Sequence, residues 1–572
     1  MATAIDILKQ HFGDQLSTAR SVRQHHSHTT TQIKSQLPDA VVFAKSTADV
    51  AAVVAVCREH LCPIVPFGVG SSLEGHVNAP KGGISIDLNA MDKVLAVYAT
   101  DLVAVVQPGV TREALNNYLR DTGLFFPIDP GANASLGGMA ATRASGTNAV
   151  RYGTMKDNIL ALEAVMADGT VIRTGSRAKK SSAGYDLTRL LIGSEGTLGL
   201  ITELTVKLHG IPEMIAGGIC SFPSIEAACN AVIASIQYGI PVARIELLDA
   251  VQVRACNRYS GLSLPEETLL LLEFHGTENS VREQSEIFGE IAAEHTPHRF
   301  KWTTDPDERA QLWKARHDAF WAALAILPGG VSMSTDVCVP ISRLAECVEE
   351  TRHDIEKTGL IAPIVGHVGD GNFHTLPIAM PDDDATWARI RKFSERLSER
   401  AIAMGGTCTG EHGIGQGKID YLRQEEPVIA GRPIPLRNKL KEFFDTILFD
   451  TEETQGLKLK WMDDKTRLTY MPPRAPDDSV NKQRKRLKGK KEPRYKDWKV
   501  SRDNPQKYPA ILDRDHYWAY VGMYNNWIAG SSIKIKFKPK DKGTKLMNVD
   551  YNRIPTDVWP KLHKEITNGR SK

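Results

Sequence analysis

Between residues 40 and 208, short β-branched runs alternate with stretches that have the apolar spacing of helices. The helical stretches are 46–59 and 111–122, whereas 62–65 and 201–208 are short apolar runs typical of buried strands. Strands that alternate with helices predict an α/β domain.

From residue 212 the pattern changes to strands and long amphipathic helices, with the helices at 224–238, 280–294 and 385–404. This arrangement predicts an antiparallel sheet that carries helices. We therefore predict an N-terminal segment (1–37), an α/β domain (38–211), a second domain (212–424) and a tail (425–572). The N-terminal segment is polar and contains His25, His26 and His28, so we expect it to be solvated.

Two late motifs carry candidate metal and acid–base chemistry. Apolar runs at 361–368 and 373–380 flank Gly-Asp-Gly-Asn, which predicts a hairpin. If only 369–372 form the turn, His367 and His374 lie directly opposite each other, with Cβ atoms roughly 5 Å apart. Glu411 is a candidate third ligand for a divalent metal, and the adjacent His412 is left as a candidate base. The alternative is a pair of hairpin histidines with ordinary partners.

Three tracts of small residues precede these motifs, at 66–76, 130–153 and 193–199. Such tracts allow backbone amides to approach an anion. The first tract lacks the third glycine of a Rossmann fingerprint, which argues against that dinucleotide-binding fold.

In this order, the three tracts and the two histidine motifs resemble the FAD-linked D-2-hydroxy-acid dehydrogenases, and among them the D-lactate dehydrogenase branch, over about residues 38–424. The resemblance implies an α+β fold of the vanillyl-alcohol oxidase type, in which an FAD-binding domain of two α/β subdomains is followed by an antiparallel-sheet cap domain. It also implies a set of FAD-binding residues: Pro66, Gly68, Gly70, Ser71, Ser72, Gly75, Pro108, Gly109, Pro130, Gly131, Ser135, Gly137, Gly138, Thr142, Ser145, Gly146, Tyr152, Gly153, Glu195, Gly196 and Ile201. Some relatives tether FAD through a histidine near the position of His76, which we interpret here as structural.

The resemblance further implies a reaction in which a small D-2-hydroxy acid passes a hydride to FAD and becomes a 2-oxo acid. His412 would take the hydroxyl proton, and a metal, zinc or manganese, would be held by His367, His374 and Glu411. We expect Arg316 to bind the substrate carboxylate because a guanidinium can form two parallel charge-assisted bonds. Arg343 is a second candidate for that role.

One sequence difference bears on the choice of substrate. Relatives that act on D-2-hydroxyglutarate carry an extra lysine in the strand corresponding to 334–337, where this chain has none. D-lactate is therefore favoured over a dicarboxylate. Cytochrome c, a quinone and electron-transfer flavoprotein all remain candidate acceptors.

Composition indicates an enzyme without a membrane span. No apolar run reaches the ~18 residues that a span needs. The eight cysteines contain no Cys-x2-Cys pair, which points to core packing in a reducing compartment. Because the N-terminus lacks a signal peptide, and Asp6 and Asp14 argue against a transit peptide, we predict a cytoplasmic protein, with a mitochondrial or peripheral membrane location as the alternative.

The tail differs in charge from the rest of the chain. Residues 451–572 contain 29 Lys and Arg against 15 Asp and Glu, a net charge of +14, whereas residues 1–450 contain 42 against 53, a net charge of −11. Basic residues interleaved with aromatics suit nucleic acid or another polyanion, although a basic linker followed by a small domain has the same pattern. We predict a strand at 533–538. An alternative function is therefore a flavoenzyme-derived scaffold with a polyanion-binding module.

Overall fold

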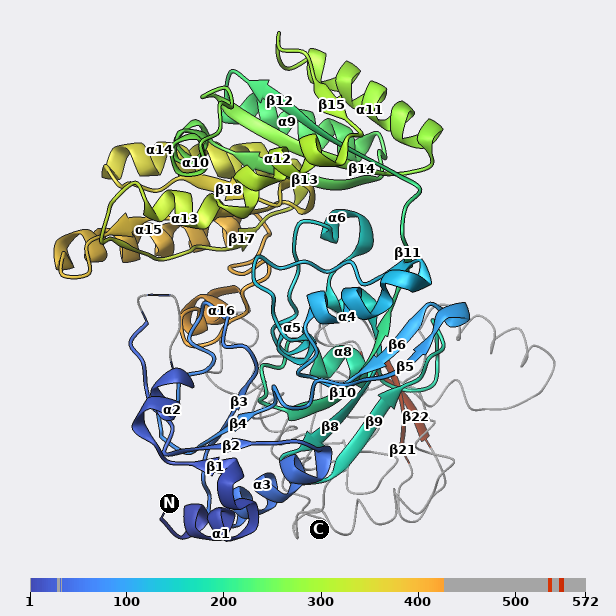
Figure 1. The fold of residues 1–572 in the computed structure, drawn as a ribbon, viewed down its shortest axis with the longest axis vertical. Helices are drawn as coiled ribbons and strands as arrows, with labels where there is room; N and C mark the ends of the chain where they lie inside the picture. The colour runs from blue at the N-terminus through green and yellow to red at the C-terminus, as the bar shows by residue number, and fades with distance from the viewer. Residues whose placement is uncertain (1, 28–30, 32, 426–532, 538–544, 550–572) are drawn as a thin grey trace. The chain divides into compact units, whose positions relative to one another are not determined.

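The computed structural model describes residues 2–27, 31, 33–425, 533–537 and 545–549 (Figure 1). Contacts separate residues 1–433 from residues 434–572. In the second unit the described residues form one antiparallel pair, β21 (Ile533–Phe537) with β22 (Lys545–Val549), which confirms a strand in that region. The predicted basic and aromatic surface of the tail lies outside the described residues.

The chain begins with a mixed four-stranded sheet in the order β1-β2-β4-β3. Its strands are β1 (Leu16–Ser17), β2 (Ala40–Phe43), β3 (Ile64–Phe67) and β4 (Ile84–Asp87), and the helices of this part are α1 (Ala2–Phe12), α2 (Arg20–His25) and α3 (Thr47–Glu59). The helix predicted at 46–59 is confirmed as α3. It begins where the Ser46 side chain accepts a hydrogen bond from the Asp49 N–H, which is a typical N-cap.

The expectation of a solvated N-terminal segment was wrong. Ala4 and Leu8 are fully buried and belong to the core of the first sheet. Their spacing places them on one face of α1, a helical signal that the overall polarity of the segment obscured. His26 is also buried, and its Nε2 lies 2.9 Å from Asp87 Oδ2 on β4. His28 lies outside the described residues.

A five-stranded antiparallel sheet follows, in the order β5-β6-β10-β8-β9. Its strands are β5 (Val94–Tyr98), β6 (Val103–Val106), β8 (Ile159–Met166), β9 (Val171–Gly175) and β10 (Gly199–Lys207), and the helices of this part are α4 (Arg112–Leu119), α5 (Leu136–Thr142), α6 (Ala149–Tyr152), α7 (Met155–Asn158) and α8 (Leu187–Leu191). The helix predicted at 111–122 is confirmed as α4 with a following 3-10 turn. A short pair, β7 (Leu124–Phe125) with β11 (His209–Gly210), completes this domain.

The cap domain is built on a seven-stranded antiparallel sheet in the order β15-β12-β14-β13-β18-β19-β17. Its strands are β12 (Met214–Phe222), β13 (Val242–Leu248), β14 (Thr268–Gly276), β15 (Lys301–Thr303), β17 (Val337–Cys338), β18 (Ile364–Gly366) and β19 (Asn372–Thr375), and a separate pair is formed by β16 (Val331–Ser332) and β20 (Ile378–Ala379). The helices are α9 (Ile225–Gln237), α10 (Ala250–Ser260), α11 (Glu278–Ala293), α12 (Pro306–His317), α13 (Ala319–Leu324), α14 (Leu344–Thr358), α15 (Asp384–Ala403) and α16 (Ile419–Glu425).

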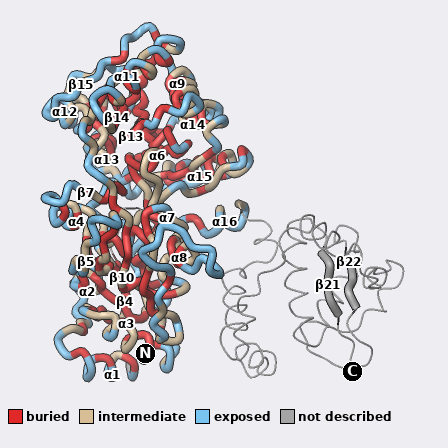
Figure 2. The backbone as a smooth tube through the Cα atoms, turned by 90° about the vertical axis from the view of Figure 1, so that its right-hand side faces the viewer, coloured by how far each residue is buried: buried red, intermediate tan, exposed pale blue. Residues whose placement is uncertain are grey.

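Helices cover both faces of this sheet, and Figure 2 shows buried residues concentrated along its central strands. Leu270 and Leu272 of β14 pack into the core that contains α9, α11 and α14, whereas Leu269 and Leu271 pack with α10, α12 and α13. Burial on both faces explains why β14 is an almost unbroken apolar run.

The hairpin that carries the two histidines is present, but its register differs from the prediction. The residue opposite His374 is Val365, whereas the prediction placed His367 there. A 3-10 turn at Val368–Asp370 and a left-handed Gly371 make the connection longer than predicted. The pairing therefore shifts by two residues. Since side chains alternate with a period of two, such a shift leaves both histidines on one face of the hairpin, as diagonal neighbours.

All eight cysteines lie in the described part of the chain and none is in a disulfide; seven are buried, in agreement with the core-packing prediction. None of the described helices has the length and hydropathy of a membrane-spanning helix.

Candidate active site

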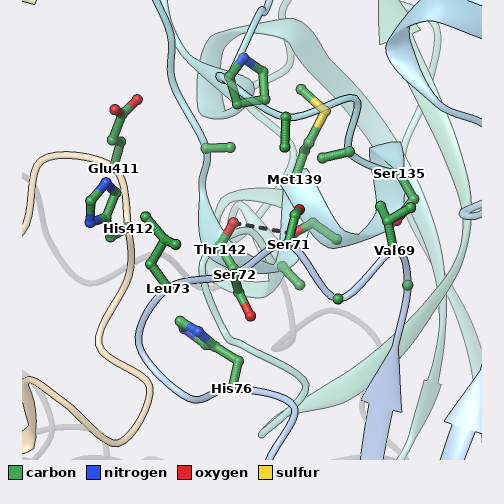
Figure 3. A pocket seen from close by; sticks show the side chains of 18 of the residues that line it. Val69, Ser71, Ser72, Leu73, His76, Ser135, Met139, Thr142, Glu411 and His412 are labelled. Carbon is green, nitrogen blue, oxygen red and sulfur yellow. Dashed lines mark hydrogen bonds between the residues drawn. The ribbon is translucent and has the colours of Figure 1, made fainter. Parts of the chain in front are cut away.

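One cavity of about 490 Å³ joins the FAD-type loops to the histidine hairpin. Its walls come from the loop after β3, from α5 and the segment before it, from the end of α12 with α13, and from the loop around Glu411. Figure 3 shows Ser71 and Ser72 on the first loop near Thr142 of α5, while Glu411 and His412 approach from a separate loop beyond Leu73.

Most of the predicted FAD-binding residues line this cavity. They are Pro66, Gly68, Gly70, Ser71, Ser72, Pro108, Pro130, Gly131, Ser135, Gly137, Gly138, Thr142, Glu195, Gly196 and Ile201. His76 lies in the same wall, and its Nε2 is 3.4 Å from Glu195 Oε2.

Six predicted residues do not line the cavity: Gly75, Gly109, Ser145, Gly146, Tyr152 and Gly153. The Tyr152 hydroxyl instead lies 2.8 Å from Nδ1 of His275 in the cap domain. Gly109 and Gly146 are glycines where the chain passes close to other backbone, since a Cβ would lie 2.6 Å from the Leu88 carbonyl oxygen and 2.4 Å from the Asp129 carbonyl oxygen, respectively.

Two glycines of the cavity wall lie where a side chain would collide with neighbouring prolines, and one serine hydroxyl of the wall has no protein partner in the described part of the chain. A Cβ on Gly137 would lie 2.4 Å from Pro108 Cβ, and one on Gly196 would lie 2.5 Å from Pro66 Cγ, so no larger residue fits there without movement. Among the described residues, the buried Ser72 Oγ has no hydrogen-bond partner. This hydroxyl is available to form a hydrogen bond with a cofactor in the cavity.

At the other end of the cavity, His367, His374 and Glu411 form a cluster whose ligand atoms all lie within 4.8 Å of one another. Glu411 Oε1 is 3.1 Å from His367 Nε2 and 3.3 Å from His374 Nε2, and Glu411 Oε2 is buried without a partner. Two imidazoles and a carboxylate with a free oxygen fit a divalent metal of the zinc or manganese kind.

In this cluster, the charge of each of His367 and Glu411 shifts the pKa of the other. Burial alone would lower the pKa of His367, but the carboxylates of Glu246 and Glu411 outweigh it and hold that pKa well above its ordinary value. For Glu411 burial acts in the opposite direction, yet the His367 charge keeps its pKa well below the ordinary value. The carboxylate is therefore ionised and ready to bind a cation.

His412 stacks on His374, with ring centroids 5.1 Å apart and planes inclined by 11°. Its Nδ1 is 3.8 Å from Glu74 Oε1. Burial would lower the pKa of His412, but the negative charge of Asp336 and the nearby Glu74 raise it overall.

Asp336 is a site residue that sequence patterns did not reveal. This almost fully buried carboxylate accepts hydrogen bonds through Oδ2 from the backbone N–H groups of Glu411 (3.0 Å) and His412 (2.9 Å), and from the Thr409 hydroxyl (2.8 Å). Lys418 Nζ lies 3.4 Å from the same oxygen. Asp336 therefore anchors the loop that carries both predicted functional residues, and its only sequence signal was a carboxylate in an otherwise uncharged segment directly before β17.

Glu246 is the second site residue that sequence patterns did not reveal. It is fully buried in β13, and one oxygen lies 2.7 Å from His367 Nδ1 while the other lies 2.6 Å from Arg316 Nε. Its signal was a charged residue inside an apolar strand. Arg316 lines the cavity near the histidine cluster, whereas Arg343 does not line it and pairs with Glu346 at the surface.

Comparisons with known proteins agree with this geometry. A family model described as "FAD binding domain" matches residues 38–175, and one described as "FAD linked oxidases, C-terminal domain" matches residues 211–445. A protein named "Probable D-lactate dehydrogenase, mitochondrial" from Danio rerio is 50% identical over 422 residues, which cover 73% of this chain and 85% of that protein. The chain belongs to the family of FAD-linked D-lactate dehydrogenases.

A second member of this family, "D-lactate dehydrogenase (cytochrome), mitochondrial" from Arabidopsis thaliana, is 44% identical over 423 residues, 74% of this chain and 75% of its own. Among solved structures, p-cresol methylhydroxylase superimposes with a TM-score of 0.63 at 17% identity, covering 78% of this chain and 93% of that one. The 4-ethylphenol oxidase from Gulosibacter chungangensis also gives 0.63 at 17% identity, over 75% and 94%. These similarities confirm the predicted fold class.

Proposed function

We propose that this protein oxidises D-lactate to the 2-oxo acid with FAD as the hydride acceptor. The observation that carries the proposal is that Arg316, the three-ligand cluster and His412 lie at one end of a cavity whose other walls are the glycine- and serine-rich segments expected to bind FAD. The groups expected to bind the substrate, hold a metal and transfer a proton thus line one cavity.

Each residue has a role that follows from its place. Arg316 donates its Nε–H to Glu246, which leaves the terminal N–H groups for the substrate carboxylate. His412 lines the cavity beside Glu411, where its ring can take the hydroxyl proton. FAD held by the glycine- and serine-rich walls of the cavity would supply the acceptor for the hydride of the substrate Cα. A zinc or manganese ion on His367, His374 and Glu411, when bound, would lower the pKa of the substrate hydroxyl.

The lining of the cavity favours a short monocarboxylate. Among the described residues, Arg316 is the one Lys or Arg in the wall, whereas a dicarboxylate such as D-2-hydroxyglutarate calls for a second cation. Ala319, Phe320, Val365 and Leu376 provide an apolar surface in the same cavity. A methyl group matches such a surface better than a second carboxylate does.

The names of the relatives support two further proposals. Several relatives are described as mitochondrial, and those from Arabidopsis thaliana and Saccharomyces cerevisiae carry "cytochrome" in their names. We therefore propose a mitochondrial location with a cytochrome as electron acceptor. The cytoplasmic prediction finds no support among these relatives.

The direct test is an anaerobic titration of the purified protein, followed by the flavin absorption band. D-lactate should bleach the band, whereas L-lactate and D-2-hydroxyglutarate should do so at least about 100-fold less efficiently, because a misplaced or unpaired polar group is costly in a closed site. Equal bleaching by D-2-hydroxyglutarate would refute the monocarboxylate assignment. Protein that binds no flavin would support the scaffold alternative instead.

A further inference from the structure

Glu246 bonds to two functional side chains of the site, His367 and Arg316. It is fully buried on β13, and its two carboxylate oxygens bond to different functional side chains. Oε1 lies 2.7 Å from His367 Nδ1, and Oε2 lies 2.6 Å from Arg316 Nε. Arg316 comes from α12, and His367 directly follows β18, so no local structure holds these two residues together.

The bond to His367 determines what that ring can do. An ionised carboxylate only accepts hydrogen bonds, so Nδ1 of His367 must carry the proton. The other nitrogen, Nε2, is the atom that lies 3.1 Å from Glu411 Oε1, and it must give up its proton when it binds a metal. A carboxylate behind a histidine also fixes the ring orientation and increases its basicity toward a metal.

The bond to Arg316 determines which edge of the guanidinium faces the cavity. With Nε–H directed at Glu246, the two terminal nitrogens remain for a ligand, and Nη2 lies 3.5 Å from His367 Nε2. The carboxylate-binding edge of Arg316 therefore lies beside the metal-binding nitrogen of His367.

We propose that Glu246 is a positioning residue that fixes the metal ligand His367 and the substrate-binding Arg316 relative to each other. This inference rests on the function proposed above. Through its two contacts, the buried carboxylate of Glu246 would control both the affinity for the metal and the binding of the substrate carboxylate. A residue that only stabilised the fold would affect neither once the protein is folded.

The energetics are consistent with this role. A lone carboxylate in this position would be costly to bury, but each of its oxygens has a nitrogen partner, His367 Nδ1 at 2.7 Å and Arg316 Nε at 2.6 Å.

The experiment compares Glu246→Gln with the matched variant Glu273→Gln. Glu273 is also buried on the same sheet face and bonds a histidine, with Oε1 2.7 Å from His275 Nε2, and it lies 3.6 Å from Arg244 Nε, but it does not line the cavity. Glutamine keeps the shape of glutamate but can accept only one of the two N–H bonds, because its amide nitrogen faces the other donor. Both variants are purified with FAD, and metal affinity is measured by chelator competition using zinc and manganese.

Glu246→Gln should weaken metal binding by about 10- to 100-fold without loss of FAD. The KM for D-lactate and the concentration of pyruvate that perturbs the flavin spectrum should each rise roughly tenfold or more, because the guanidinium loses a charge-assisted partner. Glu246→Asp, which keeps the charge but reaches only one partner, should fall between Glu246→Gln and the native protein. Glu273→Gln should lose stability without changing either binding constant.

Unchanged metal and pyruvate binding in Glu246→Gln would overturn the proposal, and so would equal losses in Glu273→Gln. Failure of both Glu246 variants to fold, while Glu273→Gln folds, would assign Glu246 to the fold alone. Native protein whose flavin D-lactate does not reduce would refute the proposed function, while the metal-affinity comparison would still test the positioning role.

Discussion

Replacing Asp336 by asparagine tests whether a buried carboxylate holds the loop that carries Glu411 and His412. Asp336 Oδ2 accepts the backbone N–H groups of both residues at 3.0 and 2.9 Å, and Asn372 Nδ2 donates to Oδ1 at 2.7 Å. Both oxygens thus face donors. In the asparagine variant an NH2 group replaces one oxygen, and in either orientation of the amide it would face a hydrogen-bond donor. At least one set of bonds is therefore lost.

The expected cost follows from the partners that remain. Burial would raise the pKa of Asp336, but Lys418, His412 and His374 hold it well below its ordinary value, so the native side chain is a charge. Breaking a buried charge pair typically costs 3 to 5 kcal/mol. Lys418 keeps Glu74 as a second partner at 3.4 Å, so we expect the lower end, about 3 kcal/mol in the free energy of unfolding.

The loss in catalysis should be separate from the loss in stability. Without its anchor the loop no longer fixes His412, and a displacement on the order of 1 Å in a catalytic group can cost about 100-fold in rate. FAD content should be unchanged, because its predicted binding loops lie elsewhere in the cavity. The assays are denaturant unfolding, flavin absorbance per protein, and the rate of anaerobic flavin reduction by D-lactate.

Asp354→Asn is the matched control for this variant. Asp354 on α14 is also buried, although less deeply, and pairs with Arg396 at 2.7 Å and Arg400 at 3.4 Å, but it does not line the cavity. Its loss should destabilise the protein by roughly 1 to 3 kcal/mol without slowing flavin reduction. The reasoning fails if Asp336→Asn reduces flavin at the native rate, or if Asp354→Asn slows reduction equally.

Three further predictions concern catalysis, the metal and pH. His412→Ala should retain FAD and lose about 10²- to 10⁴-fold in kcat, and an unchanged kcat would remove His412 from the reaction. Chelation should abolish flavin reduction without releasing flavin, and zinc or manganese should restore it; active protein without stoichiometric metal by elemental analysis would contradict the cluster assignment. Burial raises the pKa of Asp249 to about 7, so the folded state retains a proton that the unfolded state releases above about pH 4, and stability should fall as pH rises from 4 to 7. Asp249→Asn still caps α10 and should be more stable by on the order of 2 kcal/mol at pH 8, with the gain vanishing near pH 4 in pH-dependent thermal melts.

Local signals in the sequence determined the elements and much of the site. Ser46 and Ser224 precede helices that begin where those serines accept backbone N–H bonds, as expected for N-caps. The hairpin motif and the glycine tracts also appear where expected, and they meet in one cavity. These features are readable because turn chemistry and periodicity act over a few residues.

Only the tertiary structure revealed the residues that organise the site. Glu246, in β13, and Asp336, directly before β17, lie far along the chain from the residues they bond, so no spacing connects them to His367 or Glu411. Tyr152, predicted at the cofactor, turns out to contact the cap domain, because the fold decides which face of a small-residue tract borders the cavity. Sequence periodicity predicts which faces are apolar, but the partner of a buried polar group is set by long-range packing, where each buried charge must find its counterpart.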